Sequence, residues 1–288
     1  MKCYLCDKGE SKLLSEKLRY ETSGKVFKCN NCGLVFLFPQ MTPAQEREFY
    51  EKEYGEIYSS EKGTTPADLF KNRLKDAKDY FGLVKEYLST KDDCLEIGCA
   101  SGYFLATIKD YVKSVSGVES HTILRQYCND IGIMTYETID ECPKIEFDNI
   151  FLFFLLEHLG DPVNFLKKVR SILKKGGNLF IEVPNVDDAL FSLYDIPAFK
   201  SYYFTPAHQF YYSRKTLSDV LIKSGFNEFQ IKPVQRYDLS NHMNWMMTGK
   251  PGGMGRFNDI FSQELLQTYS SDLIKHNICD TLFAIAKR

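Results

Sequence analysis

From Lys91 onward, apolar stretches typical of strands alternate with amphipathic stretches typical of helices. The expected strands are DCLEI, SVSGVE, IMTY, FDNIFLFFLL and NLFIEVPN, and the expected helices are GYFLATIKDYV, HTILRQYCNDIG and DPVNFLKKVRSILKKGG. The last helix has Asp161 at its N-cap position, Pro162 in its first turn and Gly176–Gly177 at its expected end. Regular alternation of this kind predicts an α/β fold built on a doubly wound parallel sheet.

The first expected strand runs into the loop LEIGCASG, which contains Glu96, Gly98 and Gly102. In a doubly wound sheet the ligand binds beyond the carboxyl ends of the strands, and glycines there let the backbone approach it closely. A nicotinamide-binding domain would carry G-x-G-x-x-G, whereas this loop has G-x-x-x-G after an acid. Glu119 ends the next strand, where a carboxylate can accept hydrogen bonds from a ribose diol. The two features together predict a nucleoside-containing cofactor, and the glycine spacing disfavours NAD.

Four of the nine cysteines are grouped in two C-x-x-C pairs near the N-terminus. They are Cys3, Cys6, Cys29 and Cys32, and four thiolates spaced in this way can close a tetrahedron around zinc. This short segment has too little apolar surface to fold without a metal, so we predict a structural zinc ribbon. The other five cysteines are scattered singly and are expected to be small buried hydrophobes.

Four ordered motifs identify a family resemblance over roughly residues 91–230. CLEIGCASGYF, GVES, FDNIFLFFLLEHLGDP and LKKGGNLFIEVPN resemble those of class I S-adenosylmethionine-dependent methyltransferases, although Ala100 replaces the usual central glycine of the loop. The resemblance implies a Rossmann-like methyltransferase sheet with S-adenosylmethionine as the cofactor. It also implies the cofactor-binding residues, which are Glu96, Gly98 and Gly102 for the methionine end, Glu119 for the ribose, and the stretch around Thr138–Asp140 for the adenine.

The whole chain is similar to bacterial zinc-ribbon methyltransferases, many of which modify sugars of surface polysaccharides or natural products. The similar segments are CNNCGLVF followed by FYEKEYGEIY, then PAHQFYYSRKTL, and finally QRYDLSNHMNWMMTGKPGG before DTLFAIAKR. We therefore expect two domains. Residues 1–60 form the zinc-ribbon module and a connector, and residues 61–288 form the methyltransferase domain. The second domain begins with a helical flank and carries an aromatic lid over residues 185–212.

Methyl transfer to a hydroxyl requires a group that removes the hydroxyl proton, and histidine is suited to this near neutral pH. His158 follows the fourth expected strand and His208 lies in the aromatic segment, so we predict both as catalytic residues and favour His158 as the base. A divalent cation on Glu157, His158 and His208 is the alternative. However, the E-x-x-E-H motif of some metal-dependent methyltransferases has Phe154 here in place of its first acid. We predict base catalysis without a metal.

The methyl acceptor is predicted from charge and aromatic content. The formal net charge of −2 and the absence of a basic tract predict no nucleic-acid partner. Sugars can stack on the rings of residues 185–212, although these rings can equally form a self-packed lid. No apolar run is long enough for a membrane span and the N-terminus does not resemble a signal peptide, so we expect a cytoplasmic protein without a membrane partner. We predict O-methylation of a sugar or sugar nucleotide. The alternatives are an RNA methyltransferase that uses the ribbon to bind nucleic acid, and an N-methyltransferase of a small molecule.

Overall fold

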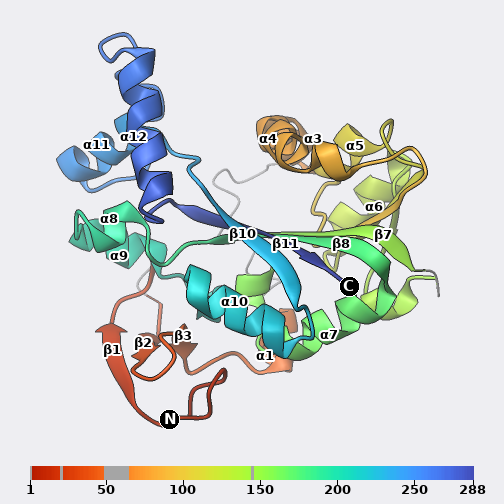
Figure 1. The fold of residues 1–288 in the computed structure, drawn as a ribbon, viewed down its shortest axis with the longest axis horizontal. Helices are drawn as coiled ribbons and strands as arrows, with labels where there is room; N and C mark the ends of the chain where they lie inside the picture. Colours follow the sequence, from red (N-terminus) through yellow and green to blue (C-terminus); the bar gives the residue numbers. More distant parts are fainter. Residues whose placement is uncertain (1, 20–21, 49–64, 144–145) are drawn as a thin grey trace.

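The computed structural model describes residues 2–288 except residues 20–21, 49–64 and 144–145 (Figure 1). A seven-stranded sheet in the order β10-β11-β8-β7-β4-β5-β6 forms the centre of the protein. The pairs from β8 to β6 are parallel, whereas β11 pairs antiparallel with both β8 and β10. The predicted α/β doubly wound sheet is confirmed, with an antiparallel edge added. The strands are β4 (Asp93–Ile97), β5 (Ser114–Val118), β6 (Met134–Tyr136), β7 (Phe147–Phe153), β8 (Leu173–Pro184), β10 (Glu228–Val234) and β11 (Thr281–Lys287).

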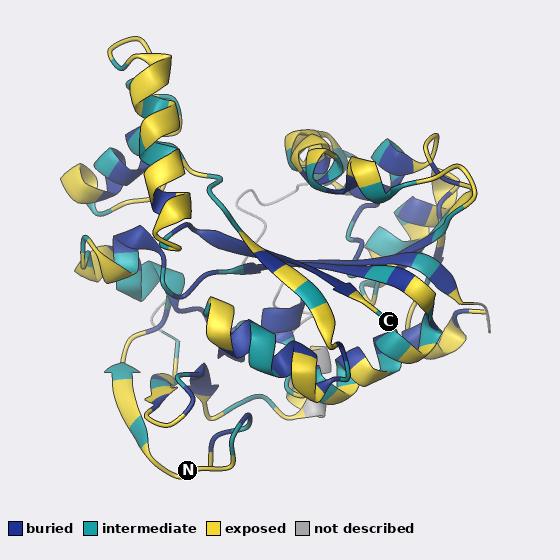
Figure 2. Ribbon diagram, in the orientation of Figure 1, coloured by how far each residue is buried: buried dark blue, intermediate teal, exposed yellow. Residues whose placement is uncertain are grey.

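Helices cover both faces of this sheet (Figure 1). On one face lie α3 (Pro66–Asn72), α4 (Leu74–Val84), α5 (Tyr103–Ile108) and α6 (Thr122–Asp130), and on the other lie α7 (Pro162–Ile172) and α10 (Arg214–Lys223). The central strands are therefore buried on both sides, as Figure 2 shows. In β7 every residue except Asp148 is buried, which agrees with its continuous apolar sequence.

The helix predicted to end at the glycines of DPVNFLKKVRSILKKGG is shorter than expected. It begins after its N-cap residue Asp161 as predicted, but it ends at Ile172, and β8 begins at the next residue. Gly176 has a φ of +81°, and a Cβ at Gly177 would lie 2.7 Å from the carbonyl oxygen of Asp148. The glycines thus allow an irregular start of β8 to pass close beside β7, and they do not end the helix.

The N-terminal cysteine segment forms part of a second, four-stranded sheet. Its strands β1 (Ser11–Ser15), β2 (Lys25–Cys29) and β3 (Val35–Phe38) pair antiparallel, and we call the segment from Cys3 to Phe38 the ribbon. The fourth strand, β9 (Phe210–Tyr211), comes from the second half of the chain and pairs with β3. The expected domain boundary between residues 60 and 61 lies outside the described residues, and α1 (Pro43–Glu48) is the described part of the connector.

The aromatic segment over residues 185–212 packs mainly on itself and on neighbouring elements. It contains α8 (Ala189–Ser192) and α9 (Pro197–Tyr203), and it contacts α11 (Leu239–Thr248), which lies beside α12 (Gln263–Lys275) in an arm that projects from the body (Figure 1). The ring centroids of Phe199 and Trp245 are 5.1 Å apart, and those of Phe204 and Tyr211 are 5.0 Å apart. These rings are buried, which supports the self-packed alternative over a platform for sugar stacking.

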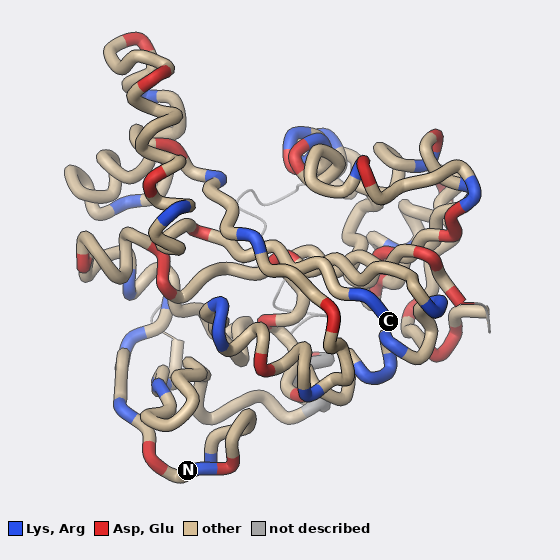
Figure 3. The backbone as a smooth tube through the Cα atoms, in the orientation of Figure 1, with Lys and Arg blue, Asp and Glu red and all other residues tan. Residues whose placement is uncertain are grey.

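Charged residues of both signs are interspersed along the chain. Figure 3 shows lysine and arginine alternating with aspartate and glutamate over most elements in this view. Within the described ranges, no helix is both long enough and apolar enough to cross a membrane.

Candidate active site and candidate metal centre

The candidate site lies where the winding of the large sheet reverses. Strand β4 pairs with β5 on one side and with β7 on the other, so the loops after these strands meet at one edge. A Cβ placed on Gly98, in the loop after β4, would lie 3.2 Å from Cδ1 of Leu155, in the loop after β7. This reversal point is where ligands bind in doubly wound folds.

The loop after β4 has the tight backbone that its glycines predict. Gly98 has a φ of +78° and Gly102 a φ of +73°, values that glycine adopts without a steric penalty. Between them, Ala100 has a φ of 48°, so the position where the family usually has glycine keeps a left-handed conformation at some cost in strain. Gly102 then directly precedes α5 as its N-cap residue.

Glu96 presents a buried acid beneath this loop. Its side chain is only 2% exposed, and its Oε2 atom has no hydrogen-bond partner among the described residues. Burial raises the pKa of Glu96 well above its ordinary value, and the nearby Cys128 and Glu119 add to this shift. The methionine end of S-adenosylmethionine carries a sulfonium and an ammonium group, and such a cation would satisfy this acid. The residues present therefore fit the implied cofactor.

Glu119 joins the loop after β4 to the loop after β5. Its Oε2 accepts a hydrogen bond from the Ala100 amide at 2.9 Å, and its Oε1 accepts one from the His121 amide at 2.8 Å. Burial raises the pKa of Glu119, and these backbone bonds oppose that shift. A carboxylate can accept more than one hydrogen bond per oxygen, so ribose hydroxyls can still bind. Contact with the ribose stays a prediction.

Replacing Glu119 with alanine is expected to weaken S-adenosylmethionine binding. Loss of charge-assisted hydrogen bonds to the ribose corresponds to a rise in Kd of about 10- to 150-fold. Isothermal titration with S-adenosylmethionine measures this. Glu137→Ala is the matched control, because Glu137 is an exposed acid that pairs with Arg125 at 2.9 Å. An unchanged Kd in Glu119→Ala would mean that this carboxylate does not hold the cofactor.

Asp140, the residue predicted near the adenine, lies at the protein surface. It belongs to the short helix η4 (Ile139–Glu141), and its carboxylate is 2.5 Å from Nζ of Lys168 on α7. The side chain of Asp140 is 76% exposed. Its contact with the adenine also stays a prediction.

The two predicted catalytic histidines lie in contact with each other. His158 ends the short helix η5 (Leu156–His158), and His208 lies just before β9. Their ring centroids are 4.7 Å apart with the ring planes at 86°, and Oε1 of Glu157 is 3.8 Å from Nε2 of His158. One ligand atom from each of the three residues lies within 4.8 Å of the others. We call Glu157, His158 and His208 the carboxylate–histidine cluster.

Burial determines the charge state of this cluster. It raises the pKa of Glu157 to about 8 and lowers the pKa of His158 to about 4. Burial and the neighbouring His158 also lower the pKa of His208 well below its ordinary value. At neutral pH the carboxyl group is therefore protonated and both imidazoles are neutral. The arrangement can accept a proton from a hydroxyl, and its donor set is also one that a divalent cation could use.

Glu157→Gln is expected to change how the free energy of unfolding depends on pH. The folded carboxyl titrates near 8 and the unfolded one near its ordinary 4.5, so between these values only the folded state holds the proton. The free energy of unfolding therefore decreases as the pH rises through that window, by up to about 1.4 kcal/mol per pH unit. Because glutamine does not titrate, the Glu157→Gln variant should lose this contribution to the pH dependence of the free energy of unfolding between pH 5 and 8. Urea unfolding at several pH values tests this against exposed Glu137→Gln, and an unchanged slope would contradict the burial of Glu157.

Another buried acid, Glu182 in β8, was not among the residues predicted from the sequence. Its Oε1 accepts a hydrogen bond from Oγ1 of Thr281 at 2.8 Å. Burial raises the pKa of Glu182 to about 7, although the charge of Arg236 opposes this. The guanidinium of Arg236 in turn lies 4.8 Å from the ring centre of Phe154, beside the loop after β7. The available signal was an acid within the otherwise apolar NLFIEVPN.

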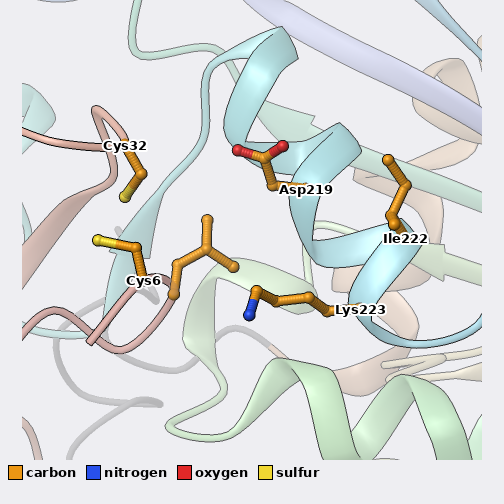
Figure 4. Close-up of a pocket in the computed structure, with 6 residues that line it drawn as sticks. Cys6, Cys32, Asp219, Ile222 and Lys223 are labelled. Carbon is orange, nitrogen blue, oxygen red and sulfur yellow. The ribbon is translucent and has the colours of Figure 1, made fainter. Parts of the chain in front are cut away.

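The four N-terminal cysteines form a candidate metal centre. The Sγ atoms of Cys3 and Cys32 are 3.5 Å apart and those of Cys6 and Cys29 are 3.6 Å apart, and all four lie within 4.8 Å of one another. Zinc–sulfur bonds of about 2.3 Å in a tetrahedron give sulfur separations of about 3.8 Å. The donor set therefore fits zinc. Figure 4 shows Cys6 and Cys32 facing α10 across a pocket of about 190 Å³.

The fold and the acids and glycines at its carboxyl edge define a class I S-adenosylmethionine-dependent methyltransferase. Residues 68–230, more than half of the chain, match the family described as "Methyltransferase domain", and the chain belongs to this family. A solved S-adenosylmethionine-dependent methyltransferase from Archaeoglobus fulgidus superposes with a TM-score of 0.53 at 19% identity, covering 77% of this chain and 97% of that one. At that identity the likeness shows the shared fold alone.

Curated relatives are similar to part of the chain. A tRNA U34 carboxymethyltransferase from Campylobacter hominis is 25% identical over 173 residues, which cover 55% of this chain and 59% of the relative. The enzyme of the same name from Campylobacter concisus is 27% identical over 119 residues, covering 37% of this chain and 41% of the relative. The chain thus spans less than two thirds of the length of these relatives.

Proposed function

We propose that this protein transfers the methyl group of S-adenosylmethionine to a hydroxyl oxygen, with His158 as the general base. The observation that carries the proposal is the contact between His158 and His208, because His158 lies in the segment after β7 whose Leu155 faces Gly98 of the loop after β4. S-adenosylmethionine supplies an activated methyl group, so the protein has to orient the acceptor and remove its proton.

The electrostatics of the carboxylate–histidine cluster support this assignment. A pKa of about 4 keeps His158 neutral at pH 7, so the imidazole is available to accept a proton. Burial makes His158 a weak base in the free protein. The ionised form of Glu157 compensates for this, because its negative charge would stabilise the imidazolium that forms when His158 takes the hydroxyl proton. The acid and the imidazole lie 3.8 Å apart, a distance that a small movement can close.

We favour an RNA acceptor over the sugar that the sequence predicts. The support is the similarity to relatives named as tRNA-modifying enzymes, which extends over 55% of this chain in one case. The burial of Phe199, Phe204, Phe210, Tyr211 and Tyr212 also weakens the argument for sugar stacking on residues 185–212.

A small sugar or sugar nucleotide is the second candidate acceptor. The specific observation in its favour is the formal net charge of −2, because most RNA-binding proteins concentrate positive charge. A small acceptor would need no such field.

Transfer of radiolabelled methyl groups distinguishes these acceptors. Full-length protein is incubated with methyl-labelled S-adenosylmethionine and either total bacterial tRNA or a mixture of nucleotide sugars. We expect the label in RNA, in a form that ribonuclease releases as a modified nucleoside. Label in the sugar fraction alone would replace the RNA proposal with the second candidate. Label on an amine would overturn O-methylation.

We also propose that the ribbon holds one structural zinc ion on Cys3, Cys6, Cys29 and Cys32. The support is the tetrahedral spacing of the four sulfur atoms. When bound, zinc would fix the two C-x-x-C turns relative to each other, while the cysteines themselves would take no part in methyl transfer.

A further inference from the structure

The ribbon and the carboxylate–histidine cluster are connected through β9. The two residues of β9 pair with Val35 and Phe36 of the ribbon strand β3. His208 lies immediately before this pairing, and its ring contacts His158. A shift of β3 would therefore be transmitted to His208 by the backbone.

Gln209 lies between β9 and the cluster and bonds to both sides. Its amide nitrogen donates to the carbonyl of Glu157 at 2.8 Å, and its carbonyl accepts from the Leu37 amide at 3.0 Å. Its side-chain Oε1 accepts a hydrogen bond from the Met41 amide at 3.0 Å. Gln209 is only 1% exposed. One buried residue thus links η5 with the end of β3 and with the chain that follows the ribbon.

Polar atoms without partners gather at this junction. Both carboxylate oxygens of Glu157, Nδ1 of His208 and Nε2 of Gln209 are buried and have no hydrogen-bond partner within the part of the chain that the structure describes. Each such atom reduces stability unless something satisfies it. A polar acceptor molecule at the cluster would bring the missing donors and acceptors.

The ribbon is also attached to the larger domain by hydrogen bonds in which neither Gln209 nor β9 takes part. The hydroxyl of Tyr4 donates to Oδ1 of Asp161 at 2.5 Å and accepts from the amide of Val163 at 3.0 Å, at the start of α7. Nε of Arg19 donates to the carbonyl of Tyr202 at 2.6 Å. The Tyr4 hydroxyl holds the ribbon to α7 without a bond to either histidine, so it provides a control.

We infer that Gln209 is a positioning residue, which holds the carboxylate–histidine cluster in place through its bonds to the ribbon and to the chain that follows it. The ribbon thereby becomes part of the side of the active site that binds the methyl acceptor. The inference rests on the proposed function only in taking this cluster as the place of methyl transfer. The main-chain bonds of Gln209, the residue after His208, tie this part of the chain to the carbonyl of Glu157 and to the amide of Leu37. Loosening them would give the two imidazoles freedom to separate.

Carbethoxylation of individual histidines by diethyl pyrocarbonate tests this in the full-length, zinc-loaded protein. The reagent modifies accessible neutral imidazoles, and peptide mass spectrometry gives a rate for each histidine. Gln209→Met removes both polar side-chain atoms and keeps the volume. We expect it to raise the rates at His158 and His208 about tenfold, the factor implied by losing its side-chain hydrogen bond with the Met41 amide. Tyr4→Phe, which removes the hydroxyl bonds at the start of α7 and keeps the ring beside Phe210, should leave both rates unchanged.

His242 provides the internal reference for general loosening. It is 1% exposed in α11 and has its own partner, because its Nδ1 lies 2.6 Å from the hydroxyl of Tyr269. Gln209→Met should leave the rate at His242 unchanged. An equal rise at all three histidines, or no rise at His158 and His208, would overturn the positioning role.

A second variant keeps the test decisive if Gln209→Met fails to fold. Met41→Pro removes the amide hydrogen that Met41 donates to Oε1 of Gln209, and it changes no residue of β9. It should raise the same two rates, and unchanged rates would again overturn the inference. Because methyl transfer is not measured, the proposed function can fail without affecting this result. Selective rate changes in a protein that transfers no methyl group would uphold the positioning role and reject the function.

Discussion

Replacing His158 with alanine is expected to lower turnover by about 10²- to 10⁴-fold, the usual contribution of a general base. The methyl group arrives already activated, so removal of the acceptor proton is the step that this residue assists. The Kd for S-adenosylmethionine should change little, because the predicted cofactor-binding residues lie in β4 and in the segments after β4, β5 and β6. Single-turnover rates with labelled cofactor, together with isothermal titration, measure the two quantities separately.

His276→Ala is the matched control for this prediction, because His276 lies exposed at the end of α12 and far along the chain from the cluster. Full activity in both His158→Ala and His208→Ala would reject base catalysis and point to an acceptor that is already nucleophilic, such as an amine. Turnover that depends on added magnesium or manganese, with the ribbon metal intact, would assign Glu157, His158 and His208 as ligands. Either result would remove the proposed mechanism.

Replacing Cys29 with serine is expected to abolish stable folding of the ribbon. Structural zinc sites contribute about 10–16 kcal/mol of apparent binding free energy near pH 7, which exceeds the stability of most whole domains. Leu34 and Phe36 of the ribbon belong to the same buried cluster as residues of β8 and α10. Unfolding of the ribbon should therefore also destabilise the large domain. We expect low soluble yield and a lower unfolding temperature, measured by circular dichroism, together with loss of zinc.

Cys142→Ser is the matched control, because Cys142 is also buried but lies outside the metal centre. Elemental analysis should find one zinc ion per chain in the wild type and in this control. A wild-type protein without stoichiometric zinc would contradict the metal assignment. A Cys29→Ser variant that lacks zinc yet melts at the wild-type temperature would contradict its structural role.

Local spacing was sufficient to predict several parts of the site. The loop after β4 requires positive φ angles at Gly98 and Gly102, and the glycines in LEIGCASG indicate this directly. The C-x-x-C pairs likewise bring sulfur atoms together within each turn. Such features depend on a few neighbouring residues, so a pattern in the sequence predicts them. Gly176 and Gly177 were predicted to end a helix, and this prediction was wrong. Their role depends on β7 passing close beside them, which neighbouring residues in the sequence do not reveal.

Hydrophobic periodicity and short-range spacing were enough to predict the doubly wound sheet, the glycine loop after β4, the cysteine pairs and the two candidate histidines. The folded structure was needed to show that His158 and His208 are in contact, that Glu157 is buried beside them, and that Gln209 joins them to the ribbon. Strand β9 is two residues long and pairs with β3 from the other half of the chain. A pairing this short leaves no periodic signal, and it forms only because the two folded sheets bring its partners within hydrogen-bonding distance.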